Sequence, residues 1–253
     1  MGNVNDYSAL ITNLFLAIIP SIILFIFVYK MDVVEKEPTS MLLRLFFLGV
    51  LCTAPAAYLE KTIINFTDIS ADDYINSFIL AFLIIAVVEE GYKYLILALG
   101  TWRNRNFDHK YDAIVYAVFI SLGFATLENI LYVHENGSEV AALRAIISVP
   151  AHAFYAVASG YFFGHAKQFA HDGNKSKEIL NIFLSIIAPI ILHGTFDYLL
   201  FLENNVILGI FFGFVALLYM VSYCSIKKVS ATKMIKDNID TEQVKEEQNE
   251  ESI

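Results

Sequence analysis

Long apolar stretches separated by short polar connections set the pattern of this 253-residue chain. Each is long enough for a helix to cross the hydrocarbon core of a bilayer, about 30 Å thick. Membrane strands would alternate in polarity and would be about half as long. The sequence therefore predicts an all-α, polytopic transmembrane helical bundle of about seven spans, at residues 10–29, 41–59, 74–99, 112–133, 140–164, 179–201 and 206–225.

The basic residues alternate along the connections and predict an orientation. Lysines and arginines gather in the connections after the first, third and fifth runs and at the start of the tail. The connections at 134–139 and 202–205 contain none, and the second connection contains only Lys61. Because cytoplasmic connections collect positive charge, we expect the N-terminus outside the cell and the C-terminus in the cytoplasm.

Composition agrees with a membrane protein and limits its partners. Hydrophobic residues make up 57% and charged residues only 17%, which excludes an ordinary soluble domain. The net charge of −9 does not indicate nucleic acid, because the acids concentrate in the tail and in the membrane. Cys52 and Cys224 lie in apolar runs, so we expect no disulfide framework. We expect one transmembrane domain at 1–225 and a disordered, cytoplasmic polar tail at 226–253.

The third run contains the most unusual chemistry, because Glu89, Glu90 and Lys93 lie inside it. Each charge at a helix centre costs about 2.5–3.5 kcal/mol, which the apolar neighbours only just offset. Spacings of three and four residues place all three on one side of a helix, so they must face the interior of a bundle. Lys93 can neutralise one glutamate as a structural ion pair, which leaves the other for proton chemistry.

Three later runs contain further polar groups: Glu128 and Asn129, then His152, then His193 and Asp197. The last two are four residues apart and project together, as two metal ligands or a His–carboxylate pair would. A lone intramembrane histidine is most often a packing group, but four runs that each supply such groups favour one shared site. Counted from the outer ends of the spans at 1.5 Å per residue, these polar residues can all meet between the membrane midplane and the outer surface. This depth predicts a cavity open to the outside.

Smaller signals concern the helices themselves. Pro150 and Pro189 shortly precede His152 and His193, and we expect each to bend its helix and free a carbonyl. GxxxG spacing indicates close helix packing at Gly160 with Gly164 and at Gly209 with Gly213. The remaining histidines fall in or next to connections and are expected to be solvated: His109, His134, His165 and His171.

Taken in order, these pieces resemble the PrsW family of intramembrane proteases, a distant relative of the CAAX-processing and bacteriocin-processing membrane endopeptidases. The wider superfamily has an arginine four residues after its second glutamate and a histidine after its phenylalanine. Lys93 and Glu128 stand here instead, which favours PrsW. The resemblance covers roughly 41–201, and its pieces are Glu89-Glu90-x-x-Lys93, Phe124-x-x-x-Glu128-Asn129, His152 and His193-x-x-x-Asp197.

The resemblance implies that residues 1–225 form a catalytic domain in the lipid bilayer. Its substrate would be a membrane-anchored protein, for example an anti-sigma factor in envelope-stress signalling, cleaved on or near its extracytoplasmic side. Two mechanisms stay open, and Lys93 holds a glutamate ionised in both. In the first, a Zn²⁺ ion activates water beside Glu89 or Glu90 as general base, and its ligands are His152, His193 and Asp197, with Glu128 as a further candidate.

In the second mechanism, one glutamate of the pair activates water directly. A histidine and Asn129 then stabilise the oxyanion. The two histidines and two carboxylates favour the metal version, although a contiguous H-E-x-x-H motif is absent.

Two other classes of protein compete with the protease. A proton- or cation-coupled transporter would use the same buried acids and histidines, but the chain has no inverted repeat and its polar groups gather toward one side. A non-catalytic receptor would keep the polar groups for packing alone.

Overall fold

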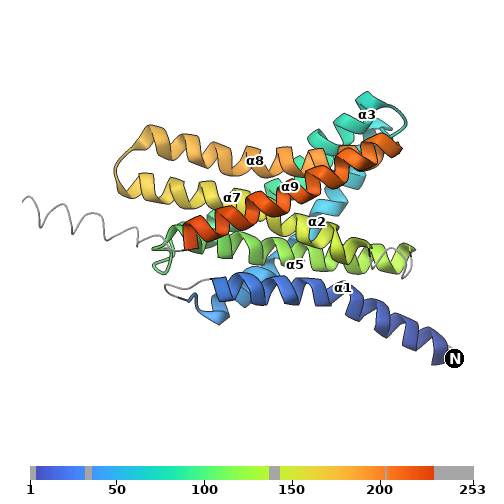
Figure 1. The fold of residues 1–253 in the computed structure, drawn as a ribbon. Helices are drawn as coiled ribbons and strands as arrows, with labels where there is room; N and C mark the ends of the chain where they lie inside the picture. Colours follow the sequence, from blue (N-terminus) through green and yellow to red (C-terminus); the bar gives the residue numbers. More distant parts are fainter. Residues whose placement is uncertain (1–3, 32–35, 137–142, 203, 231–253) are drawn as a thin grey trace, which may run out of the picture.

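Helices joined by short connections make up the backbone in the computed structural model, which describes residues 4–31, 36–136, 143–202 and 204–230 (Figure 1). No strand occurs in these ranges, so the all-α class is confirmed. The rest of the predicted polar tail, beyond Ser230, lies outside the described residues. The elements are α1 (Val4–Met31), α2 (Thr39–Thr67), α3 (Tyr74–Phe78), η1 (Ile79–Ile85), α4 (Ala86–Thr101), α5 (Lys110–Asn136), α7 (Ser148–His171), α8 (Lys175–Phe201) and α9 (Asn205–Ser230).

Helices of membrane-spanning length confirm a multi-pass membrane protein. Within the described residues, five helices are long and apolar enough: Thr39–Thr67, Lys110–His134, Leu143–His171, Lys175–Phe201 and Asn205–Ser230. The first predicted run falls in α1, a helix of 28 residues. The third run is divided among α3, η1 and α4. The count of seven spans and the orientation of the termini stay predictions.

The core is centred on α5, where every residue from 111 to 126 is buried. A helix that is apolar on all sides must be covered on all sides, and α5 packs against α1, α2 and α7. Figure 1 shows it between α1 and the antiparallel pair α7 and α8. Both cysteines are free, with Cys52 buried and Cys224 exposed.

Glycines let the central helices approach until their backbones touch. A Cβ atom added at Gly123 of α5 would lie 2.0 Å from the Phe46 carbonyl oxygen of α2. The predicted pair Gly160 and Gly164 on α7 likewise meets the backbone of α5. The second predicted pair does not pack in this way, because a Cβ at Gly209 or Gly213 would meet nothing within 4 Å.

Pro150 and Pro189 each free a carbonyl that a neighbouring helix uses. Pro150 lacks the N–H that would bond the Ile146 carbonyl, and that oxygen accepts a hydrogen bond from Tyr219 Oη of α9 at 2.8 Å. Pro189 frees the Ser185 carbonyl in the same way, and Ser159 Oγ of α7 donates to it at 2.9 Å. The prolines therefore create one link from α9 to the residues just before α7 and another from α7 to α8.

A π-helix precedes the acidic pair. In η1 the hydrogen bonds span five residues, so the Ala86 N–H donates to the Ala81 carbonyl. This wider turn rotates the following helix relative to an uninterrupted α-helix, and π segments are frequent at functional sites. The π-helix ends at Ile85, four residues before Glu89, so it sets the direction in which the acidic pair faces.

Replacing Gly123 by alanine should destabilise the fold, because the new methyl group meets α2 backbone that cannot move aside cheaply. We expect a loss of about 1–3 kcal/mol, the usual cost of overpacking. Thermal unfolding of the purified protein in detergent measures it. Gly213→Ala is the matched control and should leave the melting temperature equal or slightly higher. Equal effects of the two substitutions would contradict the packing described here.

Candidate active site

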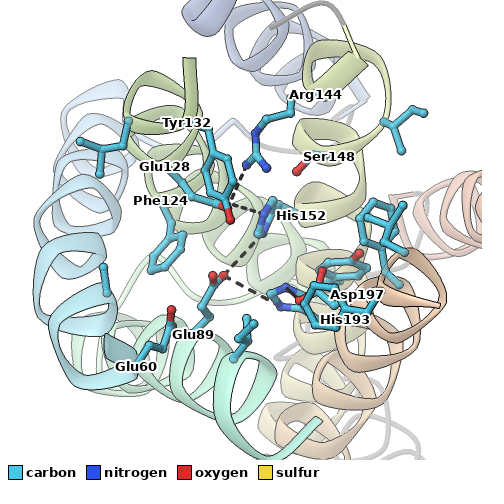
Figure 2. Close-up of a pocket in the computed structure, with 18 of the residues that line it drawn as sticks. Glu60, Glu89, Phe124, Glu128, Tyr132, Arg144, Ser148, His152, His193 and Asp197 are labelled. Atoms are coloured by element: carbon cyan, nitrogen blue, oxygen red, sulfur yellow. Dashed lines mark ion pairs between the residues drawn. The ribbon is translucent and has the colours of Figure 1, made fainter. Parts of the chain in front are cut away.

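A cavity of about 800 Å³ opens at the end of the bundle where α2, α5 and α8 finish and α7 and α9 begin. Most of its wall is apolar, with Ile64, Ile85 and Phe211 among the lining residues. Figure 2 shows acidic and basic side chains converging on it from different helices. The acidic and basic residues that line the cavity are Glu60, Lys61, Glu89, Glu128, Arg144, His152, His193 and Asp197.

Lys93 holds the acidic pair in place. Its Nζ atom lies 3.0 Å from Glu89 Oε2 and 2.7 Å from Glu90 Oε1, as their helical spacing predicts. The same ammonium lies 4.3 Å from the centre of the Phe124 ring, which adds a cation–π contact. All three charged residues are buried, but only Glu89 lines the large cavity. Glu89 is therefore the carboxylate that can meet a substrate, and Glu90 lies behind it.

His193 is bound by a carboxylate at each ring nitrogen. Its Nδ1 atom lies 2.9 Å from Glu90 Oε1, and its Nε2 atom lies 3.3 Å from Asp197 Oδ2. The ring also stacks on Tyr155, with 4.9 Å between centroids. Both nitrogens can donate only when the ring is an imidazolium, so the geometry favours a positive charge beside the cavity.

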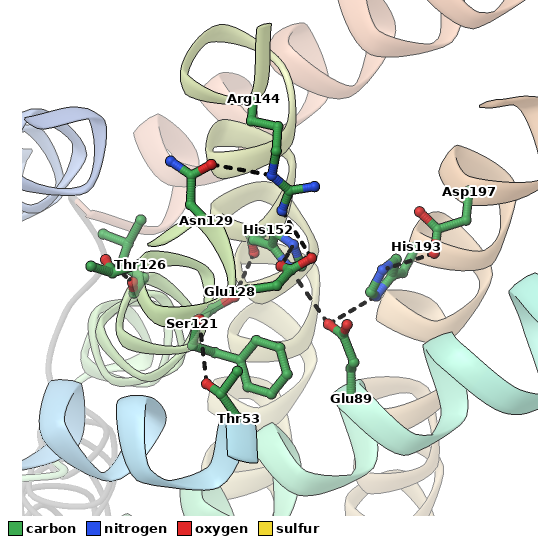
Figure 3. A network of polar contacts seen from close by, with 12 residues as sticks. Thr53, Glu89, Ser121, Thr126, Glu128, Asn129, Arg144, His152, His193 and Asp197 are labelled. Atoms are coloured by element: carbon green, nitrogen blue, oxygen red, sulfur yellow. Dashed lines mark hydrogen bonds and ion pairs between the residues drawn. The ribbon is translucent and has the colours of Figure 1, made fainter. Parts of the chain in front are cut away.

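His152 links α7 to two other helices. Its Nε2 atom lies 2.9 Å from Glu128 Oε2 of α5, and its Nδ1 atom lies 3.1 Å from Lys93 Nζ of α4. The ammonium can only donate, so Nδ1 accepts from Lys93 and the ring proton lies on Nε2, beside the Glu128 carboxylate. Its backbone carbonyl accepts from Ser121 Oγ at 2.8 Å (Figure 3). His152 is thus fixed in position and in tautomer.

Most of the predicted site residues meet around this cavity, as the convergence of four spans suggested. Glu89, Glu128, His152, His193 and Asp197 line it, and Glu90 and Lys93 lie directly behind. Asn129 is fully buried but does not line the cavity; its Oδ1 atom accepts a hydrogen bond from Arg144 Nε at 3.1 Å. The catalytic and metal-binding roles of all eight stay predictions.

Arg144 is one of two charged residues at the cavity that the sequence reasoning missed, and Glu60 is the other. One guanidinium nitrogen lies 2.8 Å from Glu128 Oε1, and the guanidinium carbon lies 3.9 Å from the centre of the Tyr132 ring. Together with its bond to Asn129, this clamps one face of α5 (Figure 3). The signal was present, because an arginine inside a predicted span needs a partner.

His109 corrects a prediction, because it is 4% exposed and not solvated. Its Nδ1 atom lies 2.8 Å from Asp108 Oδ1, and Asp112 accepts two backbone N–H groups at the start of α5, from Asp108 and His109. The cluster therefore closes the N-terminus of the core helix.

Comparison with known proteins agrees with this geometry. The model of the "PrsW family intramembrane metalloprotease" matches residues 37–226. The chain belongs to the PrsW family. Proteins named Protease PrsW are 37% identical over 188 residues in Bacillus subtilis (74% of this chain, 82% of the relative) and 34% identical over 220 residues in Oceanobacillus iheyensis (86% and 96%). The relative from Clostridioides difficile is 31% identical over 217 residues (84% and 89%). No solved structure gave a significant match.

Membership of the PrsW family makes the chain an intramembrane peptidase, which decides against the transporter and receptor alternatives. The family is described as one of metalloproteases, and the buried group of Glu89, Glu90, His152 and His193 has donors that could hold a metal ion, all within 4.8 Å of one another. Imidazole nitrogens and carboxylate oxygens are ligands that Zn²⁺ accepts.

Lys93 already serves as the cation of this group. Its Nζ atom contacts Glu89, Glu90 and His152, three of the four donors. A divalent ion among the same donors would lie against the ammonium and be repelled by it. Asp197 does not relieve this conflict, because it contacts the His193 nitrogen that faces away from Glu90. The arrangement therefore does not fit a metal ion while Lys93 remains in place.

Replacing Arg144 by glutamine should lower kcat/KM about 10–100-fold, the usual cost of removing a group that orients a site residue. Glu128 would lose its cation and release His152. Arg144→Lys should lose less, because the charge stays. Cleavage of a membrane-anchored substrate measures the effect, with the exposed Arg105→Gln as control. If Arg144→Gln cleaves as fast as the wild type, the clamp has no part in activity.

Proposed function

We propose that this peptidase cleaves a membrane-anchored protein on or near its extracytoplasmic side, with Glu89 as the general base. The observation that carries the proposal is the position of Glu89, a carboxylate at the wall of a cavity large enough for a peptide segment, backed by Lys93. An anti-sigma factor is one substrate of this kind. The basic connections favour the same side, because they predict that α2, α5 and α8 end outside the cytoplasm, where the cavity opens.

Peptide hydrolysis needs a base for water, positive charge for the oxyanion and a proton for the leaving amine. Glu89 takes a proton from water, and the resulting hydroxide adds to the carbonyl carbon of the substrate. His193, with carboxylates at both nitrogens, supplies positive charge beside the developing oxyanion. The carbon–nitrogen bond then breaks as Glu89 returns its proton to the amine. Lys93 keeps Glu89 ionised before each turnover.

Removing the base should abolish cleavage without unfolding the protein. We expect Glu89→Gln to lower kcat at least about 100-fold, the contribution of a positioned general base, with little change in KM. The test is co-expression with candidate single-span proteins tagged at both ends, comparing fragments from wild type and variant. Glu178→Gln, at the far end of α8, is the matched control. Wild-type fragments that persist with Glu89→Gln would contradict the proposed mechanism.

Removal of metal separates this mechanism from the zinc version. Because Lys93 takes the place of an ion among the donors, we expect purified protein to retain full activity after chelation and dialysis. Elemental analysis of the same sample should find less than about one metal ion per ten chains, since a structural cation is already supplied by the chain. One zinc ion per chain, with activity lost on chelation and restored by Zn²⁺, would overturn the metal-free mechanism and leave the protease assignment intact.

A further inference from the structure

Glu60 of α2 differs from the other acids of the cavity. Four carboxylates line it in the described structure, and three of them have a cation: Glu89 has Lys93, Glu128 has Arg144, and Asp197 has His193. Glu60 has no ion pair there, and its Oε1 atom is buried without a hydrogen-bond partner. Figure 2 shows its carboxyl directed into the cavity near Glu89. A carboxylate in this position is costly without a partner.

The cations near Glu60 already pair with other acids and could pair with Glu60 only by breaking those contacts. Lys93 and His193, its two positive neighbours, each contact two carboxylates already. Arg144 is held by Glu128, Asn129 and the ring of Tyr132. Lys61 also lines the cavity, but adjacent residues of a helix point in different directions and do not face each other. Within the part of the chain that the structure describes, no cation pairs with Glu60, which leaves that place to a group of the substrate.

The surroundings of Glu60 define the chemistry of that partner. Ala57 and Ile64 lie three residues before and four residues after it on the same helix face, and both line the cavity with Ile85 of η1. An apolar wall with one carboxylate suits a side chain that has an aliphatic stem and a cationic end. Lysine and arginine are the two protein side chains of this form.

We propose that Glu60 forms a subsite for a lysine or arginine side chain of the substrate, close to the scissile bond. The proposal rests on the proposed proteolysis, because Glu60 and the general base Glu89 share one cavity. Such a subsite would select among membrane-anchored proteins, since cationic residues are scarce at the extracytoplasmic ends of their spans. Glu60 acts in it as a specificity residue and takes no part in bond cleavage.

The test uses the full-length protein in liposomes and a single-span substrate that it cleaves. Substrate variants place one lysine, arginine, glutamine or glutamate at each position within about five residues of the cleaved bond, the reach of an extended chain across the cavity. For the wild type we expect one position at which lysine and arginine raise kcat/KM about 10–100-fold over glutamine, through KM, as a charged hydrogen bond does.

Charge exchange makes the test specific. With Glu60→Gln, the lysine-to-glutamine ratio of kcat/KM at that position should fall to about one, and with Glu60→Lys the glutamate substrate should become the preferred one. Glu178→Gln is the control and should keep the wild-type ratio, because its carboxylate pairs with Lys175 far from the cavity.

Three results would overturn the subsite. The first is a wild type that cleaves lysine and glutamine substrates equally at every position. The second is a Glu60→Gln variant that keeps the wild-type preference, and the third is a Glu60→Lys variant that does not reverse it. Failure of the proposed function looks different: the wild type would then cleave no better than Glu89→Gln on any substrate, and the subsite would fall with it.

Discussion

The ammonium of Lys93 is the contact on which the arrangement of the membrane domain depends. Two adjacent carboxylates in apolar surroundings repel each other and lack water, so they require a cation that is itself fully bonded. Lys93 meets both from its own helix and reaches across to His152 of α7. Glu90 extends the link to His193 of α8. One buried charge thus joins α4, α7 and α8, and removing a partner would leave an uncompensated charge at a cost of about 3–5 kcal/mol.

The backbone is shaped so that these side chains can meet. Glycines bring α2 and α7 against α5 at backbone contact, and the π-helix before α4 sets the direction of the acidic pair. From Arg144 to Asp197 the contacts then run without a break through Glu128, His152, Lys93, Glu90 and His193. Both ends of this chain of contacts lie at the cavity. A substrate group that changed the contacts at one end would alter the charge distribution at the other, because hydrogen bonds in a chain polarise one another.

Sequence reasoning could recover what helical periodicity controls. The spacing of Glu89, Glu90 and Lys93 is enough to place them on one shared face of a helix, and the same holds for His193 with Asp197. Periodicity could not reveal which member of a pair faces the cavity, because that depends on the π-turn and on the packing of other helices. It also could not separate the packed glycine pair from the unpacked one, since both have the same spacing.

Arg144 and Glu60 show a second limit. Arg144 lies near the start of the predicted span 140–164, and Glu60 follows the end of the predicted span 41–59. Charged residues near the ends of spans are commonly assigned to the membrane surface. Their importance comes from three-dimensional neighbours on other helices, which sequence spacing does not encode. A stricter rule would have found both: every charge within one helical turn of a predicted span needs a named partner or a named use.

Lys93 shows how an internal ammonium can take the place of a metal ion in an acidic site. Metal ligands must give their lone pairs to the ion, and a metal centre therefore gains nothing from a cation that binds the same atoms. An internal ammonium, by contrast, is supplied by the helix that holds the acids and is in place as soon as that helix folds. It sets a positive charge beside Glu89 at the cavity wall without recruiting an ion through the membrane. Preorganised charge of this kind lowers the cost of reorganisation during reaction, which is the main way proteins stabilise developing charge. The geometry thus favours a peptidase whose essential cation is part of its own sequence.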